Sequence, residues 1–181
     1  MAVIQSLVAK FEKNYNKSKF FFNMYANQYK NILNNEIKLG NISKKDRVLN
    51  IGCGGMPFTA IFLSEMTGAE IIAIDHDEEA VKKASEFVSR NNIKNISIIC
   101  SKGQNINEIS FNKALVALQA FPKVDILNNL LKISEKGSRL IFRQPRNIFK
   151  GNYDFLDEKT ADSFVKQKMI TFNKSLLYIV R

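Results

Sequence analysis

The sequence predicts an α/β protein with a doubly wound, mostly parallel sheet and helices at its N-terminus, and three observations support this prediction. From Asp46 onward, apolar runs suited to buried strands alternate five times with segments of helical periodicity. The stretch "VLNIGCGGMPFTA", residues 48–60, places three glycines between the first strand and its helix. An acid, Asp75, ends the second strand. Because ligands of such sheets bind beyond the carboxyl ends of the strands, this turn and this acid mark the expected ligand crevice.

Two helices are expected before the sheet. Residues 2–13 and about 19–38 each place apolar side chains on one helical face, and Gly40 ends the second helix. We expect residues 1–40 to form a helical segment that packs on or caps the core. Residues 41–181 are expected to form a single compact domain.

The elements of that domain are indicated by composition and by signals at their ends. The segment "RVLNIG", residues 47–52, is a continuous apolar run, as expected for a strand buried on both faces. Pro57 opens the next helix and Gly68 closes it, and acids in the first turn favour a helix from Asp77. Further strands are expected at 70–75, 96–100, 113–118 and 138–144, with helices at 57–68, 77–91 and 124–137. The tail predicts a polar helix over about 156–167 and strand-like runs at 169–172 and 175–180.

Composition favours one globular, cytoplasmic domain. The 181 residues suffice for a full core, 45% are apolar, and no apolar run reaches the roughly 18 to 20 residues that span a bilayer. The N-terminus lacks the long apolar stretch of a secretory signal. Two cysteines and one histidine, without ligand spacing, predict no metal site. The net charge of +10 allows a nucleic-acid partner, but the lysines are scattered, which favours a solvated basic surface.

The glycine turn and Asp75 together suggest a nucleoside ligand. Glycines let the backbone approach a ligand without intruding Cβ atoms, and a carboxylate after the second strand can accept both hydroxyl protons of a ribose. Asp75 could instead cap the next helix, a role for which Asp77 is at least as well placed. A dinucleotide site would have a glycine at position 57, where this chain has Pro57. The pattern therefore favours S-adenosylmethionine, which has no pyrophosphate to be bound.

The segments "DRVLNIGCGG" and "IIAIDHDEEAVKKASEFV" resemble the first two motifs of class I S-adenosylmethionine-dependent methyltransferases, over about residues 44–145. The resemblance implies a Rossmann-like sheet of seven strands, the seventh antiparallel, in an S-adenosylmethionine-binding domain over residues 41–181. Three departures from the family pattern are Asn50 in place of an acid, Met56 in place of a third glycine, and Lys102 near an Asp that often meets the adenine. The expected cofactor-binding residues are Gly52, Cys53, Gly54, Gly55, Asp75, His76, Lys102, Gln104 and Gln119.

The segments "GCGGMPFTAI" and "MYANQYKNILNNEI", with residues 115–149, also resemble nicotianamine synthases, which implies transfer of an aminocarboxypropyl group rather than a methyl group. We expect methyl transfer to a small-molecule acceptor, with aminocarboxypropyl transfer and a non-catalytic nucleoside-binding module as alternatives. The chain lacks the [DN]-P-P-[YF] run of exocyclic-amine methyltransferases, which disfavours nucleic-acid bases as acceptors. Gln119 and Phe121 are expected either to line the acceptor pocket or to pack within their own loop. No catalytic residue and no oligomeric state are assigned.

Five further polar residues each have two interpretations. Tyr25 and Tyr29 lie on the apolar stripe of the second helix, so they either close over the cofactor or belong to the core. Glu36 could move a proton, but a solvated helix face is favoured. Arg143 and Arg146 flank Pro145 after the fifth strand, where two guanidinium groups could hold an acceptor carboxylate or phosphate. The alternative for both arginines is a surface ion pair.

Overall fold

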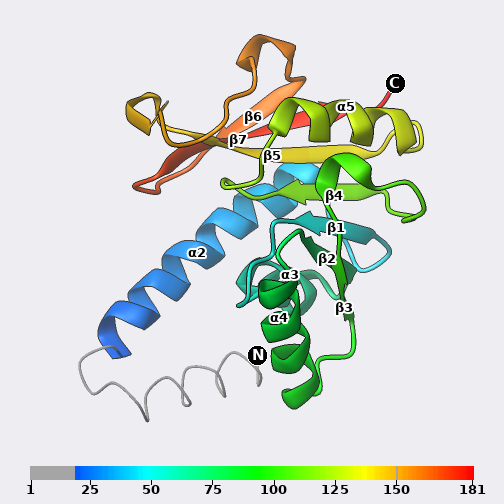
Figure 1. The fold of residues 1–181 in the computed structure, drawn as a ribbon. Helices are drawn as coiled ribbons and strands as arrows, with labels where there is room; N and C mark the ends of the chain where they lie inside the picture. Colours follow the sequence, from blue (N-terminus) through cyan, green and yellow to red (C-terminus); the bar gives the residue numbers. More distant parts are fainter. Residues whose placement is uncertain (1–18, 150) are drawn as a thin grey trace.

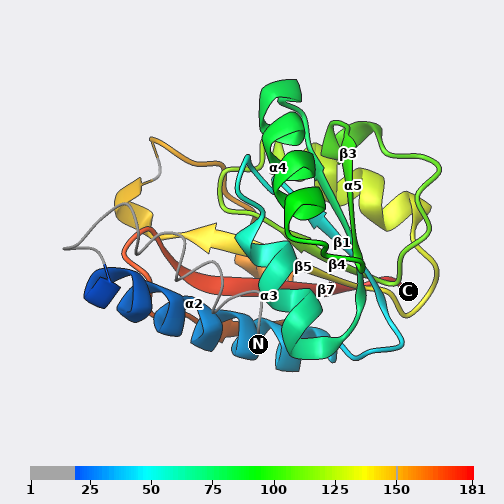
Figure 2. The ribbon, with the colours of Figure 1, turned by 90° about the horizontal axis from the view of Figure 1, so that it is seen from below.

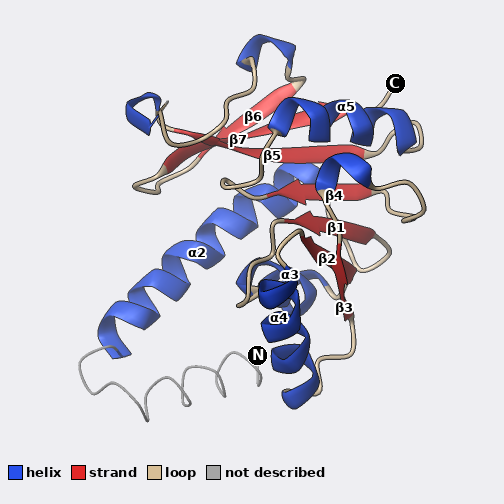
Figure 3. Cartoon of the chain, in the orientation of Figure 1, coloured by secondary structure: helices blue, strands red, loops and turns tan. Residues whose placement is uncertain are grey.

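The computed structural model describes residues 19–149 and 151–181, so the helix expected over residues 2–13 lies outside the described part, as does the side chain of Tyr25. Seven strands form one sheet in the order β3-β2-β1-β4-β5-β7-β6 (Figures 1 and 3). The strands are β1 (Arg47–Ile51), β2 (Glu70–Asp75), β3 (Ile96–Cys100), β4 (Lys113–Val116), β5 (Arg139–Pro145), β6 (Ser163–Lys166) and β7 (Phe172–Ile179).

The sheet is mostly parallel, which confirms the predicted fold class. Strands β1 to β5 pair in parallel, whereas β7 is antiparallel to both β5 and β6. Strand β1 lies between β2 and β4, so the chain winds outward from β1 in both directions. This reversal is the topological switch point at which doubly wound sheets bind their ligands.

Helices cover both faces of the sheet. The helices are α2 (Lys19–Gly40), α3 (Phe58–Thr67), α4 (Glu78–Arg90) and α5 (Lys123–Ile133). Alternate strand residues face opposite sides, and the two apolar clusters of the core follow this alternation. Ile71 packs in one cluster with residues of α2, α3 and α4, whereas Ile72 packs in the other with residues of α5. Figure 2 shows α2 and α3 together along one side of the sheet. Among the described residues, no helix is long and apolar enough to cross a membrane.

The ends of the helices follow the signals in the sequence. Gly68 ends α3 in the left-handed conformation, with φ of 72°. Asp77 caps α4, because its Oδ1 accepts hydrogen bonds from the main-chain N–H groups of Glu79 at 2.8 Å and Ala80 at 3.3 Å. Asp77 therefore performs the capping role that was the alternative for Asp75.

Two predictions for the C-terminal tail are wrong. The expected polar helix over 156–167 is instead a 3₁₀ turn at Glu158–Thr160 followed by β6. The expected strand at 169–172 is mostly the connection between β6 and β7, where Ile170 is 81% exposed. Here pairing with β7 decides the structure, since "SFVK" has a partner strand and "MIT" does not. The strand expected at 175–180 is confirmed as the main part of β7.

Candidate functional site

A cleft lies at the carboxyl ends of β1, β2 and β4, as the switch-point rule predicts. It has two halves that share five lining residues. The glycine turn contributes Gly52, β2 and its end contribute Asp75 and His76, and the loop after β4 contributes Ala120 and Phe121. Because the two halves adjoin each other at these shared residues, one elongated ligand, or a cofactor and an acceptor, could occupy them together.

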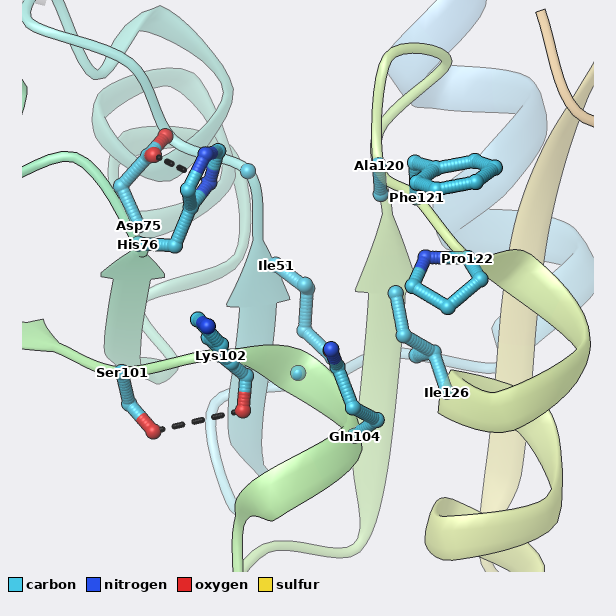
Figure 4. A pocket seen from close by; sticks show the side chains of 12 residues that line it. Ile51, Asp75, His76, Ser101, Lys102, Gln104, Ala120, Phe121, Pro122 and Ile126 are labelled. Carbon is cyan, nitrogen blue, oxygen red and sulfur yellow. Dashed lines mark hydrogen bonds and ion pairs between the residues drawn. The ribbon is translucent and has the colours of Figure 1, made fainter.

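The first half has a volume of about 290 Å³ and suits a flat heterocycle. Figure 4 shows Asp75 and His76 on one side of it, with Phe121 and Pro122 across from them. This half is tightly packed at Gly103, because a Cβ added there would lie 3.0 Å from Ile51 Cγ2. The remaining lining residues are Ser101, Lys102, Gln104 and Ile126. Apolar walls with a few amide and hydroxyl groups are typical of a nucleobase pocket.

The glycine turn uses its glycines for two different reasons. Gly52 has φ of 79°, and a Cβ there would lie 3.1 Å from the Cβ of Ala117, so a side chain would press the turn away from β4. Gly54 has φ of 65°, but a Cβ there would meet no protein atom within 4 Å. Gly54 therefore borders open space in the second half, where a ligand can approach the backbone. Gly55 lines neither half and packs near Lys83.

Asp75 is the acid among the residues that line both halves. Its Oδ2 accepts a hydrogen bond from the main-chain N–H of Gly54 at 2.8 Å, and its Oδ1 accepts one from the N–H of Asp77 at 3.2 Å. His76 Nδ1 lies 3.4 Å from the same Oδ1. A carboxylate has about four acceptor positions, so these contacts leave capacity for ligand hydroxyl groups. The two backbone bonds also fix the carboxylate between β2 and the glycine turn.

The surroundings of two polar side chains explain the departure at Asn50 and the state of the Cys53 thiol. Asn50 is buried, and its Nδ2 donates to the main-chain oxygen of Leu115 at 3.1 Å. An Asp could not donate to that carbonyl, so this neighbour favours an amide. Burial, together with the charge of Asp75, raises the pKa of the Cys53 thiol to about 12. The thiol thus stays protonated and is a poor nucleophile.

The second half, of about 440 Å³, is more polar. Tyr29 from α2, Thr59 from α3 and Arg143 from β5 bring hydroxyl and guanidinium groups to its wall. Met56 and Phe58 provide the apolar surface beside them. The other residues that line only this half are Cys53, Gly54, Ala117 and Gln119.

A buried hydrogen-bond network holds these polar groups in place. Arg143 forms a two-point ion pair with Glu36, with Nε–Oε1 and NH2–Oε2 distances of 2.9 Å. Arg143 NH1 donates to Tyr29 Oη at 2.8 Å, and Tyr29 Oη and Thr59 Oγ1 are 2.5 Å apart. Ser175 Oγ donates to Glu36 Oε1 at 2.7 Å. Burial alone would lower the pKa of Arg143, but Glu36 and Tyr29 raise it above its usual range, so the guanidinium stays charged.

The contacts of Glu36, Arg143 and Arg146 correct the expectations for these three residues. Glu36 does not lie on a solvated face, because its side chain is completely buried. Arg143 forms a buried rather than a surface ion pair, in which its Nε and NH2 groups both donate to the carboxylate of Glu36. Arg146 Nε donates to the main-chain oxygen of Met169 at 2.9 Å, so this arginine ties the connection between β6 and β7 to β5. Both guanidinium groups are therefore held by protein acceptors, which disfavours the open anion clamp that was one of their two interpretations.

Lys123 is a buried cation beneath the loop that follows β4, and the sequence does not distinguish it from the other lysines. It opens α5, directly after the loop that contributes Phe121. Its Nζ donates to the main-chain oxygens of Arg143 at 3.0 Å and Asp154 at 2.9 Å. Burial lowers the pKa of Lys123 to about 8, against the opposing effect of the Asp154 charge.

Eight of the nine expected cofactor-binding residues line the cleft. Sequence reasoning missed Phe58 and Thr59, although a lone hydroxyl in the apolar helix "PFTAIFL" is a usable signal for Thr59. Gly55 is the exception among the nine. The first half has Lys102 and Gln104, the second has Cys53, Gly54 and Gln119, and both have Gly52, Asp75 and His76.

Comparison with curated proteins finds a similar enzyme. L-histidine 2-aminobutanoyltransferase of Yersinia pestis is 25% identical over 119 residues, which are 66% of this chain and 45% of that enzyme. The chain thus spans less than half the length of this relative.

Solved structures show the same fold. MtNAS, a nicotianamine synthase solved in complex with MTA and tNA, superposes with a TM-score of 0.79 at 20% identity, over 100% of this chain and 69% of MtNAS. A mutant of MtNAS has been solved with S-adenosylmethionine. An RNA methyltransferase from Salinibacter ruber, in complex with S-adenosyl-L-homocysteine, gives a TM-score of 0.66 at 13% identity, over 82% of this chain and 90% of that chain.

The sequence also matches a protein family over most of its length. Residues 42–176 match the family described as "Methyltransferase domain". This segment runs from just before β1 into β7 and includes all the cleft residues except Tyr29. The expected resemblance is confirmed, together with S-adenosylmethionine as the cofactor of the family. The chain belongs to the methyltransferase-domain family of S-adenosylmethionine-dependent transferases.

Proposed function

We propose that the protein transfers a methyl group from S-adenosylmethionine to a small polar acceptor that binds in the second half of the cleft. The observation that carries this proposal is the division of the cleft at Gly52 and Asp75. One half suits a nucleoside, and the adjoining half presents hydroxyl groups. The bond that is broken would lie where the two halves meet.

The residues present fit S-adenosylmethionine. Asp75 keeps acceptor capacity for ribose hydroxyl groups, and Gly54 leaves open space beside the turn. Lys102 and Gln104 offer hydrogen-bonding groups in the nucleobase half. The cofactor supplies an electrophilic sulfonium, so the protein needs mainly to position the acceptor.

The second half would orient that acceptor. Tyr29 and Thr59 present hydroxyl oxygens that are fixed by Arg143, which Glu36 fixes in turn. Such a preorganised set favours an acceptor with amino or carboxyl groups over an apolar one. A volume of about 440 Å³ is in the range of small-molecule sites.

A second candidate, transfer of the aminocarboxypropyl group, is favoured by two comparisons. The similarity to MtNAS extends over the whole chain, including α2 with Tyr29. The Yersinia pestis relative is named for transfer of a 2-aminobutanoyl group to L-histidine. Both reactions use the same cofactor and differ in which carbon of the sulfonium is attacked.

The released nucleoside distinguishes the two reactions. The purified protein is incubated with S-adenosylmethionine and a deproteinised metabolite extract, and the nucleosides are identified by mass spectrometry. S-adenosylhomocysteine supports methyl transfer, whereas methylthioadenosine above the enzyme-free breakdown rate supports aminocarboxypropyl transfer. Asp75→Ala is the matched control and, at a concentration of S-adenosylmethionine too low to saturate the wild type, should form either product at least tenfold more slowly. If the wild-type protein binds the cofactor but forms neither product with a broad set of acceptors, the transferase proposal fails and a nucleoside-binding module remains.

A further inference from the structure

The loop that follows β4 places a phenylalanine ring where the two halves of the cleft meet. Phe121 lines both halves and is 75% exposed. Figure 4 shows it across the first half from Asp75 and His76. A ring that is so exposed is not packed within its own loop, which was one of its two expected roles, so its surface is available to a ligand.

The main chain is anchored on both sides of this ring. Before it, the N–H of Ala120 donates to the oxygen of Ala117 at 3.3 Å. After it, the N–H of Lys123 donates to Asp154 Oδ2 at 2.6 Å, and the buried Lys123 Nζ donates to the main-chain oxygen of Asp154 at 2.9 Å. These contacts hold the loop without any ligand, so little further ordering is needed when a ligand meets the ring of Phe121.

The meeting point of the two halves favours positive charge. Asp75 lines both halves, as Phe121 does. Burial and the charge of Asp75 raise the pKa of the Cys53 thiol to about 12, which indicates that this carboxylate acts across the glycine turn. The face of an aromatic ring is negative as well, and it attracts a cation that lies within about 6 Å of the ring centre. A cation here would thus have a carboxylate on one side and an aromatic ring on the other.

We propose that the ring of Phe121 contacts the sulfonium of S-adenosylmethionine and makes the site prefer this cation to the neutral thioether that remains after transfer. This inference rests on the proposed function, which places the broken bond where the two halves meet. When the acceptor attacks the carbon beside the sulfur, the electron pair of the broken carbon–sulfur bond stays on the sulfur, and the positive charge is lost. The same holds for methyl and for aminocarboxypropyl transfer. Phe121 therefore favours binding of the cofactor and release of the spent nucleoside in either reaction.

Three substitutions separate the charge preference of the ring from its bulk. Phe121→Leu keeps an apolar contact for the ligand but removes the aromatic face. Phe121→Tyr keeps the ring and is the conservative variant. Phe164→Leu is the matched control, because Phe164 is a half-exposed phenylalanine on β6 that lines neither half of the cleft.

The test is isothermal titration calorimetry of the full chain with S-adenosylmethionine and with S-adenosylhomocysteine, in the absence of an acceptor. Phe121→Leu should weaken binding of S-adenosylmethionine roughly 3- to 30-fold, the strength of a cation–π contact, and should change binding of S-adenosylhomocysteine less than about twofold. In Phe121→Tyr and Phe164→Leu, the ratio of the two dissociation constants should stay within about twofold of the wild-type ratio. Urea unfolding of each variant verifies that it is folded.

The ratio of the two dissociation constants decides the outcome. A loss in Phe121→Leu that is selective for S-adenosylmethionine, with the ratio kept in the other two variants, supports the inference. Equal weakening of both ligands would assign the ring to the nucleoside and overturn it, as would unchanged binding of both. A selective loss of the same size in Phe121→Tyr or Phe164→Leu would also contradict it, because both variants keep a ring at position 121. If the wild type binds neither ligand, the proposed function fails as well, whereas binding of both with a ratio independent of Phe121 refutes this inference alone.

Discussion

Lys123 offers a quantitative test of the described packing. Its ammonium group is completely buried, and its two side-chain hydrogen bonds go to the main-chain oxygens of Arg143 and Asp154. A neutral amine still has two N–H groups, so it can satisfy both carbonyls without a charge. Burial therefore disfavours the charged form more than its contacts, including the charge of Asp154, stabilise it. The pKa of Lys123 falls from 10.5 to about 8 as a result.

The sign and size of the pH effect follow from this shift. Between pH 8 and 10.5 the unfolded chain holds a proton on this lysine that the folded chain has lost. The free energy of unfolding should then rise with pH, by about 1.4 kcal/mol per pH unit. Over this window, the contribution of Lys123 amounts to about 3 kcal/mol, and it is flat below pH 8, where both states are protonated.

Urea unfolding at several pH values between 7 and 10.5 measures this contribution. Other groups titrate in the same range, so the wild-type protein is compared with Lys123→Met, which should lack the rise. The variant should also be less stable at pH 7, since two buried carbonyls lose their donor. Lys132→Met, which removes an exposed lysine from the same helix, is the control and should keep the wild-type profile. Parallel pH profiles for the wild type and Lys123→Met would refute the inferred pKa and the burial of the charge.

Three further substitutions test the cleft. Asp75→Ala should weaken binding of S-adenosylhomocysteine in calorimetry by roughly 10- to 100-fold, because hydrogen bonds to a charged group contribute about 1.5 to 3 kcal/mol, and unchanged affinity would exclude Asp75 as a ligand contact. Gly54→Ala should weaken the same binding at least tenfold, whereas Gly137→Ala, which also has positive φ and open space, should only destabilise the fold by about 1 to 2 kcal/mol. Glu36→Gln should lower the free energy of unfolding by about 3 to 5 kcal/mol, since Arg143 would stay buried without its counter-charge. Addition of Arg143→Met to this variant should restore part of the loss, and no recovery would show that the ion pair is not the cause.

The glycine turn and Asp75 could be predicted because their signals are local. The positions of Gly52, Gly54 and Asp75 follow from a strand, a turn and the next strand, and the parallel sheet brings the ends of those strands together. The polar groups of the second half could not be predicted in this way. Tyr29, Thr59 and Arg143 come from three elements, and Arg143 is 114 residues from Tyr29 along the chain. The hydrophobic periodicity of the sequence does not indicate that side chains so far apart along the chain come together.

The ion pair of Glu36 and Arg143 was nevertheless within reach of physical reasoning. Glu36 follows Tyr29, Ile32 and Leu33 at the spacing that places all four on one face of α2. A solvated position for Glu36 therefore contradicted the stripe on which it lies. Arg143 likewise has a charged side chain at a position where its surroundings indicate burial, since it lies in the mostly apolar strand "RLIFRQP". A buried charge of either sign requires an opposite one, and an acid on the inner face of a helix with an arginine inside a strand is the pairing that satisfies both. Two charges that each violate the hydrophobic pattern thus predict each other, and they do so without any knowledge of the ligand.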